Sequence, residues 1–211
     1  MRKEVRCRYL AKSKLIRCNF NNGVFHYVNL KGAIIKKTDF KNASFYGVDF
    51  LGTTFNNCNF IGAKFKDTIF VACKINKCNF KGAIFNNSIF VNTNLECIES
   101  KLVEGNKVEI FRQYPKVELQ HDLIIAIEEL KSNIHFMKTK VLHLSNNRYN
   151  YVNIMLLLRI FKQDELEKVL IIAKEKIKID IVSYGHMEKE LKKLWENDII
   201  IDVPLHAIER L

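Results

Sequence analysis

The chain has 211 residues, of which 48% are hydrophobic, and its 34 Lys and Arg against 23 Asp and Glu give a net charge of +11. This length allows one large domain or two small ones, and this composition excludes a wholly disordered chain. The longest apolar run, residues 152–158, is far shorter than the roughly 20 residues of a membrane-spanning helix. The first residues contain no apolar run of signal-peptide length, so we expect a cytoplasmic protein with reduced cysteines.

An apolar residue recurs at every fifth position from residue 10 to residue 95. This spacing excludes an amphipathic helix, which requires intervals of three and four residues. From residue 13 onward, the residue two positions before each apolar one is small or β-branched, as Cys58 is before Phe60. Two inward positions in every five predict a chain that turns a corner every five residues, so that four sides close a coil of twenty. The phenylalanines that we predict to fill the axis are Phe20, Phe40, Phe45, Phe50, Phe55, Phe60, Phe65, Phe70, Phe80, Phe85 and Phe90.

Segments such as KGAIIKKTDFKNASFYGVDF (31–50) resemble the pentapeptide-repeat proteins, whose pattern is a small residue, a polar residue, Leu or Phe, and two variable residues. The resemblance covers residues 8–97. It implies a right-handed quadrilateral β-helix whose coils lie about 4.8 Å apart, as adjacent strands do. We therefore predict a pentapeptide-repeat solenoid over residues 1–100, followed by a linker or cap over 101–118.

Four of the six cysteines occupy the small inward position of the repeat: Cys18, Cys58, Cys73 and Cys78. We interpret them as small hydrophobic residues of the core. A metal site or a redox pair is disfavoured, because the sequence has no C-x-x-C spacing and no inward histidine in these columns. We therefore expect no metal and no cofactor.

One predicted face of the coil is basic. Residues 1–100 hold 16 Lys and Arg against 6 Asp and Glu, so they carry nearly all of the excess charge. The basic face consists of Lys14, Arg17, Lys36, Lys37, Lys74 and Lys77. Such a face attracts polyanions, including nucleic acid. It has no aromatic residue on which bases could stack, because the phenylalanines are predicted to point inward.

A second predicted face is apolar toward its C-terminal coils. The residues of this apolar strip are Leu51, Ile69, Val71, Ile89 and Val91. A contiguous apolar patch on a solenoid indicates a docking surface. Three occupants remain open: a segment from the C-terminal half of the chain, a second copy in a homodimer, or another protein.

Helical spacing replaces the period of five after residue 97 and predicts a small, mainly α-helical domain over residues 119–211. We expect helices near 121–135 and 151–162, with residues 146–153 as an Asn-capped start. A third helix should begin with Asp164 as its N-cap, and a fourth should contain Met187, Leu191, Leu194 and Trp195. Residues 140–146 and 198–204 are predicted to be short strands.

No catalytic motif is found in the chain, and five of its histidines are scattered over the C-terminal half. We therefore predict a non-enzymatic scaffold for protein–protein interactions, with no catalytic residue. Two alternatives remain open. The resemblance implies a DNA gyrase modulator of the quinolone-resistance type, which acts as an acidic DNA mimic and conflicts with the positive charge of the repeats. The basic face favours direct binding of nucleic acid instead.

Overall fold

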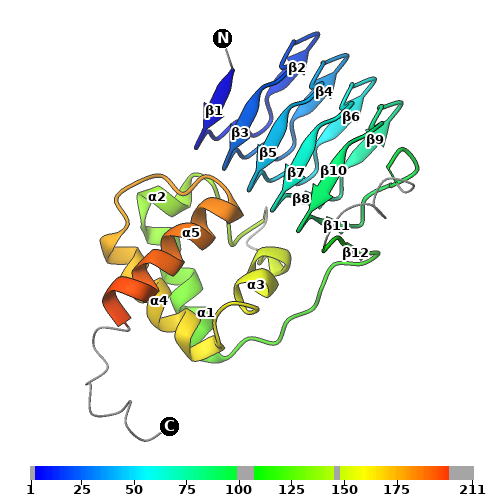
Figure 1. Ribbon diagram of the computed structural model, residues 1–211. Coiled ribbons are helices and arrows are strands. Elements are labelled where there is room, and N and C mark those ends of the chain that lie inside the picture. Colours follow the sequence, from blue (N-terminus) through cyan, green and yellow to red (C-terminus); the bar gives the residue numbers. More distant parts are fainter. Residues whose placement is uncertain (1–2, 99–106, 145–147, 200–211) are drawn as a thin grey trace, which may run out of the picture. The chain divides into compact units, whose positions relative to one another are not determined.

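The computed structural model describes residues 3–98, 107–144 and 148–199 (Figure 1). The chain forms two compact units. The repeat unit comprises Met1–Pro115 together with Val182–Gly185, and the helical unit comprises Lys116–Ile181 together with His186–Leu211. The repeat unit is a β-solenoid and the helical unit contains α-helices, as the two periodicities predict.

Three sides of the solenoid are parallel sheets of three-residue strands. The first sheet contains β1 (Glu4–Arg6), β3 (Val24–His26), β5 (Ser44–Tyr46), β7 (Lys64–Lys66) and β10 (Ile84–Asn86). The second contains β2 (Lys14–Ile16), β4 (Ile34–Lys36), β6 (Thr54–Asn56) and β9 (Lys74–Asn76). The third contains β8 (Ile69–Val71), β11 (Ile89–Val91) and β12 (Glu109–Phe111). Paired residues differ by twenty in number, as Phe45 and Phe65 do, so the predicted coil of twenty is confirmed.

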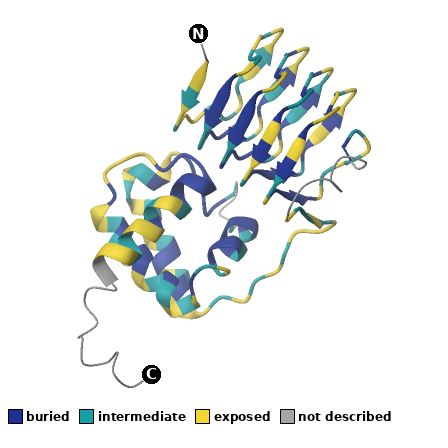
Figure 2. Cartoon of the chain, in the orientation of Figure 1, coloured by how far each residue is buried: buried dark blue, intermediate teal, exposed yellow. Residues whose placement is uncertain are grey.

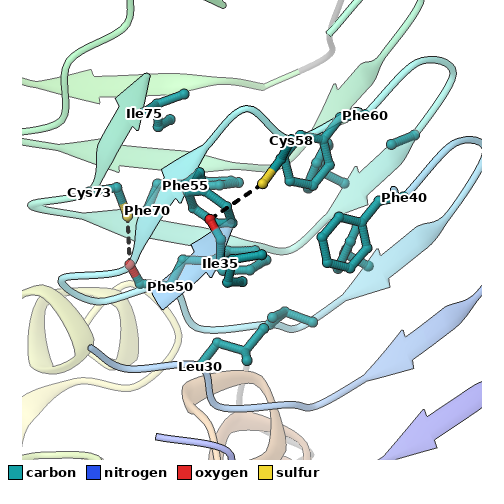
Figure 3. Packing of buried hydrophobic residues seen from close by; sticks show 14 of the residues in the cluster. Leu30, Ile35, Phe40, Phe50, Phe55, Cys58, Phe60, Phe70, Cys73 and Ile75 are labelled. Carbon is teal, nitrogen blue, oxygen red and sulfur yellow. Dashed lines mark hydrogen bonds between the residues drawn. The ribbon is translucent and has the colours of Figure 1, made fainter. Parts of the chain in front are cut away.

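The core is a column of aromatic rings (Figure 3). Phe40 and Phe60 lie one coil apart, and their rings stack with centroids 5.0 Å apart and planes 1° from parallel. Every phenylalanine predicted for the core is buried except Phe20, which is partly exposed. Phe20 lies near the N-terminal end of the solenoid, where few coils remain to cover it.

The small inward residues also form hydrogen bonds between coils. The Oγ1 atom of Thr53 donates to the carbonyl oxygen of Leu30 at 2.8 Å. The Sγ atom of Cys58 donates to the carbonyl oxygen of Ile35 at 3.4 Å (Figure 3). In both cases the acceptor lies 23 residues earlier in the chain. The interpretation of Cys58 as merely small is therefore incomplete, because its thiol occupies the place of a hydroxyl donor.

The fourth side of the solenoid is held by isolated bridges, which join Asn19, Asp39, Asn59 and Asn79 in one column. Asn59 Oδ1 accepts the backbone N–H of Ile61 at 3.1 Å, and Asp39 Oδ1 accepts that of Lys41 at 3.1 Å. Such side-chain turns to the residue two positions ahead are typical of Asn and Asp. They explain why these residue types recur at the corner.

The predicted linker contributes one more rung to the solenoid. Strand β12 (Glu109–Phe111) pairs in parallel with β11, although its residue Ile110 is exposed. Ile98 is buried in the same core cluster as the phenylalanines, and Val108 packs against it. Residues 108–111 of the predicted linker or cap (101–118) therefore form a capping element of the solenoid.

The helical unit is built around the packing of α1 against α4. Its elements are α1 (His121–Glu129), η2 (Leu130–Ser132), α2 (Ile134–Met137), α3 (Tyr151–Leu157), α4 (Gln163–Lys176), α5 (Tyr184–Leu194) and the π-helical turn η4 (Trp195–Ile199), with the first two residues of α5 assigned to the repeat unit. None of the helices within the described ranges is long and apolar enough to cross a membrane.

Several local predictions for this half need correction. The helix predicted near 121–135 is split into α1, η2 and α2. Asp164 is not an N-cap, because Glu165 Oε2 accepts the backbone N–H of Lys162 at 2.7 Å and α4 begins one residue before Asp164. Within residues 140–144, the described part of the predicted strand 140–146, there is one bridge, between His143 and Tyr149.

Two other local predictions have different outcomes. The Asn-capped start near residue 150 is confirmed, because the side chain of Asn150 accepts the backbone N–H of Asn153. The predicted strand 198–204 begins in the π-helical turn η4, and its remainder lies outside the described residues.

Candidate functional site

The basic residues lie on one sheet of the repeat unit, formed by β2, β4, β6 and β9 (Figure 1). Each strand points its middle residue into the core, as Ile35 does in β4, and its two flanking residues outward. Lys14 begins β2, Lys36 ends β4 and Lys74 begins β9. The alternation of the strands thus fixes the side on which these cations lie.

The other three cations stand at the corner that follows each strand. Arg17, Lys37 and Lys77 have φ angles of 55°, 50° and 50°, and Asn57 with 52° occupies the same corner on β6. The corner is held by the next coil, because the backbone N–H of Lys37 donates to the carbonyl oxygen of Asn56 at 2.9 Å. The left-handed backbone is therefore rigidly supported, and the side chains project from fixed points.

All six cations of this surface are exposed, beside buried inward residues (Figure 2). None of them forms an ion pair or a side-chain hydrogen bond within the described part of the chain. We call this surface the basic sheet; its cations are Lys14, Arg17, Lys36, Lys37, Lys74 and Lys77. Like charges one rung apart, about 4.8 Å, repel each other. The uncharged β6, with Thr54, Asn56 and Asn57, separates the two charged halves of the sheet.

The apolar strip does not form an exposed surface. Ile69, Val71, Ile89 and Val91 are each at most 6% exposed, and Leu51 is half-buried. The described residues of these coils therefore present no open apolar surface, and of the three occupants left open by the sequence none is identified by this burial alone. Strands β8 and β11 are buried over their whole length, so their outward residues belong to internal packing.

A segment between the third and fourth predicted helices, Val182–Gly185, completes the repeat unit, and no periodic pattern predicts this. The Oγ atom of Ser183 donates to the carbonyl oxygen of Gly47 at 3.0 Å, and the backbone N–H of Tyr184 donates to Asp49 Oδ2 at 2.8 Å. Gly185 comes so close that a Cβ built on it would lie 2.9 Å from the Cα of Gly47. Burial raises the pKa of the Asp49 carboxyl to about 7, against the effects of the Tyr184 hydrogen bond and Lys31.

The core cysteines differ in acidity, because the hydrogen bond with Cys78 lowers the pKa of the Cys58 thiol to about 7. Burial raises the pKa of the Cys73 thiol to about 12, so this side chain stays protonated at neutral pH. In the described ranges, no group of three His, Cys, Asp or Glu side chains is arranged to hold a metal ion.

Comparisons with known proteins agree with the solenoid. A family model described as pentapeptide repeats (9 copies) matches residues 15–64 and 30–74, and a second described as pentapeptide repeats (8 copies) matches residues 70–96. A comparison with curated proteins finds no significant match.

Several solved structures are similar to part of the chain. The pentapeptide repeat protein Rfr23 from the cyanobacterium Cyanothece 51142 is 19% identical, with 51% of this chain and 86% of that chain covered and a TM-score of 0.27. HetL from Nostoc sp. strain PCC 7120, a pentapeptide repeat protein involved in heterocyst differentiation regulation, is 10% identical, with 44% and 48% covered and a TM-score of 0.32. QnrB1, a plasmid-mediated fluoroquinolone resistance protein, is 10% identical, with 52% and 90% covered and a TM-score of 0.18.

Proposed function

Because residues 15–96 of this chain are a pentapeptide-repeat domain, we propose that the protein is a non-enzymatic scaffold whose basic sheet docks an acidic surface of a partner protein. The observation that carries this proposal is the exposure of all six cations of the basic sheet, without an ion pair among the described residues. The backbone that carries these cations is held by hydrogen bonds between coils, so a partner needs to order only their side chains.

The chemistry of the basic sheet favours carboxylates. Lys36 and Lys37 are neighbours at the end of β4, and Lys74 and Lys77 flank β9. Between these pairs, the amides and the hydroxyl of β6 supply both donors and acceptors. A partner surface with Asp and Glu on both sides of an uncharged polar centre would complement this arrangement. Complementary charge also increases the rate of association.

Nucleic acid fits the basic sheet less well. A flat sheet has no helix or ribbon that could enter the major groove of a duplex. Single strands bind on aromatic platforms, whereas the outward residues of β2, β4, β6 and β9 include no aromatic side chain. An acidic mimic of a duplex requires the opposite charge to that of this sheet.

The experiment that tests this function compares captures from a nuclease-treated cell lysate. One variant reverses four charges of the basic sheet (Lys36→Glu, Lys37→Glu, Lys74→Glu and Lys77→Glu). The matched control reverses four exposed lysines of the helical unit (Lys116→Glu, Lys168→Glu, Lys178→Glu and Lys193→Glu), so both proteins carry the same net charge.

We expect the wild type and the control to capture the same acidic protein, and the basic-sheet variant to lose it. Loss in both variants would mean that only the net charge matters and would contradict a specific surface. Binding that disappears from the wild type on nuclease treatment would replace the protein partner by nucleic acid.

A further inference from the structure

The helical unit contains a cavity of about 200 Å³. Its walls come from three neighbouring stretches of chain: the start of η2, the end of α2, and residues 140–144 before the bridge to Tyr149. The described residues that line the cavity all fall within 130–144 of the helical unit.

Most of the wall is apolar. Leu130, Phe136, Val141 and Leu142 are all buried, and Met137, which is 50% exposed, stands where the wall reaches solvent. A dry cavity of about 150 Å³ is large enough for benzene, and pockets for drug-sized ligands begin near 300 Å³. The cavity therefore suits a ring or chain of about six to eight carbon atoms.

The polar part of the wall is basic. It consists of Lys131, Lys140 and His143, and none of the described lining residues is acidic. Lys131 is paired with Glu128, whereas Lys140 is exposed and has no ion pair among the described residues. The two lysine charges, of Lys131 and Lys140, exceed the single negative charge of Glu128, so the net charge at this part of the wall is positive.

His143 adds a buried polar group to this wall. Its Nε2 atom has no hydrogen-bond partner within the described ranges, and the nearest carboxylate oxygen, Glu128 Oε1, lies 3.5 Å away. Burial and the charge of Lys131 lower the pKa of the imidazole, an effect that Glu128 opposes, and the neutral form of the ring is thereby favoured. A buried polar atom without a partner is costly and is stabilised by a ligand that can hydrogen-bond to it.

We propose that this cavity binds a small monocarboxylic acid, with its ring or chain against Phe136 and Leu142 and its carboxylate paired with Lys140. The mainly apolar wall favours a ligand with an apolar body, and the size excludes a long acyl chain. The positive charge at the cavity distinguishes an acid from a neutral compound of the same shape.

The experiment titrates the full chain with sodium benzoate and sodium hexanoate by isothermal calorimetry. Benzyl alcohol and hexan-1-ol are the matched neutral probes. The Lys140→Gln variant removes the cation from the cavity, and Lys168→Gln removes an exposed cation from α4 as the control. The Met137→Trp variant fills the mouth of the cavity at a partly exposed position, and circular dichroism checks the fold of all three.

At least one carboxylate should bind with a stoichiometry of one, at least tenfold more tightly than its alcohol. Binding should weaken at least tenfold in Lys140→Gln and in Met137→Trp, and stay unchanged in Lys168→Gln. No saturable binding of either carboxylate up to about 10 mM, a range that includes weak ligands, would overturn the proposal. Equal affinity for acid and alcohol, or an unchanged Lys140→Gln, would also overturn it.

Discussion

The carboxyl group of Asp49 accepts the backbone N–H of Tyr184 at 2.8 Å, across 135 residues of chain. Its other oxygen, Oδ1, is buried without a hydrogen-bond partner among the described residues. Desolvation therefore dominates, and it raises the pKa of this carboxyl to about 7. The repeat unit thus holds residues 182–185 through a group that titrates near neutral pH.

This contact makes the stability of the repeat unit depend on pH. The folded state binds a proton at Asp49 up to about pH 7, whereas the unfolded chain releases it near pH 4. Stability should therefore fall as the pH rises from about 4 to 7 and then level off, by on the order of 2–4 kcal/mol. Urea unfolding of the wild type and Asp49→Asn across this range measures the effect. The variant should lose this dependence, and identical pH profiles for the two proteins would contradict the assignment.

Phe60→Ala should destabilise the repeat unit by about 3–5 kcal/mol. Phe60 is 1% exposed, and its ring stacks on those of Phe40 and Phe80. Phe20→Ala is the comparison, because this ring is partly exposed and should cost clearly less. Chemical denaturation monitored by circular dichroism gives both values. Equal losses would mean that the column does not become better packed toward the middle of the solenoid.

The hydrogen bonds between coils predict different tolerances at two buried positions. Thr53→Val keeps the shape but removes the donor to Leu30, and should cost about 1–2 kcal/mol. Cys58→Ser keeps a donor toward the carbonyl oxygen of Ile35 and should change stability by less than about 1 kcal/mol. Thermal unfolding of the two variants tests this. A larger loss for Cys58→Ser would show that the size and apolar character of the thiol matter more than its hydrogen bond.

Two glycine corners separate backbone strain from steric conflict. Gly47 and Gly52 have φ angles of +58° and +64°, so an alanine at either position costs about 1–2 kcal/mol. A Cβ on Gly47 would lie 2.7 Å from Cδ1 of Tyr27, whereas a Cβ on Gly52 would meet nothing within 4 Å. Gly47→Ala should therefore lower the melting temperature clearly more than Gly52→Ala. Equal shifts would exclude the close approach of Tyr27.

Much of the repeat unit can be predicted from the sequence. In a coil of twenty residues, the residue number gives both the side of the solenoid and the coil in which the residue lies. The outward position of Lys36 and the inward position of Phe60 need no information beyond this period. The burial of Val71 could not be obtained in this way, because the period gives the direction of a side chain but not what covers it. The contact of Ser183 with Gly47 joins segments 136 residues apart and has no periodic signal.

In the helical unit, helix existence was easier to predict than helix ends. Apolar spacing predicts the buried face of α4 correctly. The first residue of the helix is set by one hydrogen bond, from the backbone N–H of Lys162 to the side chain of Glu165, which makes Lys162 the N-cap in place of Asp164. The cavity beside Phe136 has no sequence signature, because its walls meet only through turns.

The most direct test of the basic sheet as a docking surface is site-specific photo-crosslinking in cells. A photoreactive amino acid replaces Thr54, at the start of β6 in the centre of the basic sheet. The control places it at Ile84, which is 41% exposed on β10 of another sheet. We predict a nuclease-resistant adduct with a protein at position 54 and none at position 84. No protein adduct at position 54, or equal adducts at both positions, would contradict the proposed function.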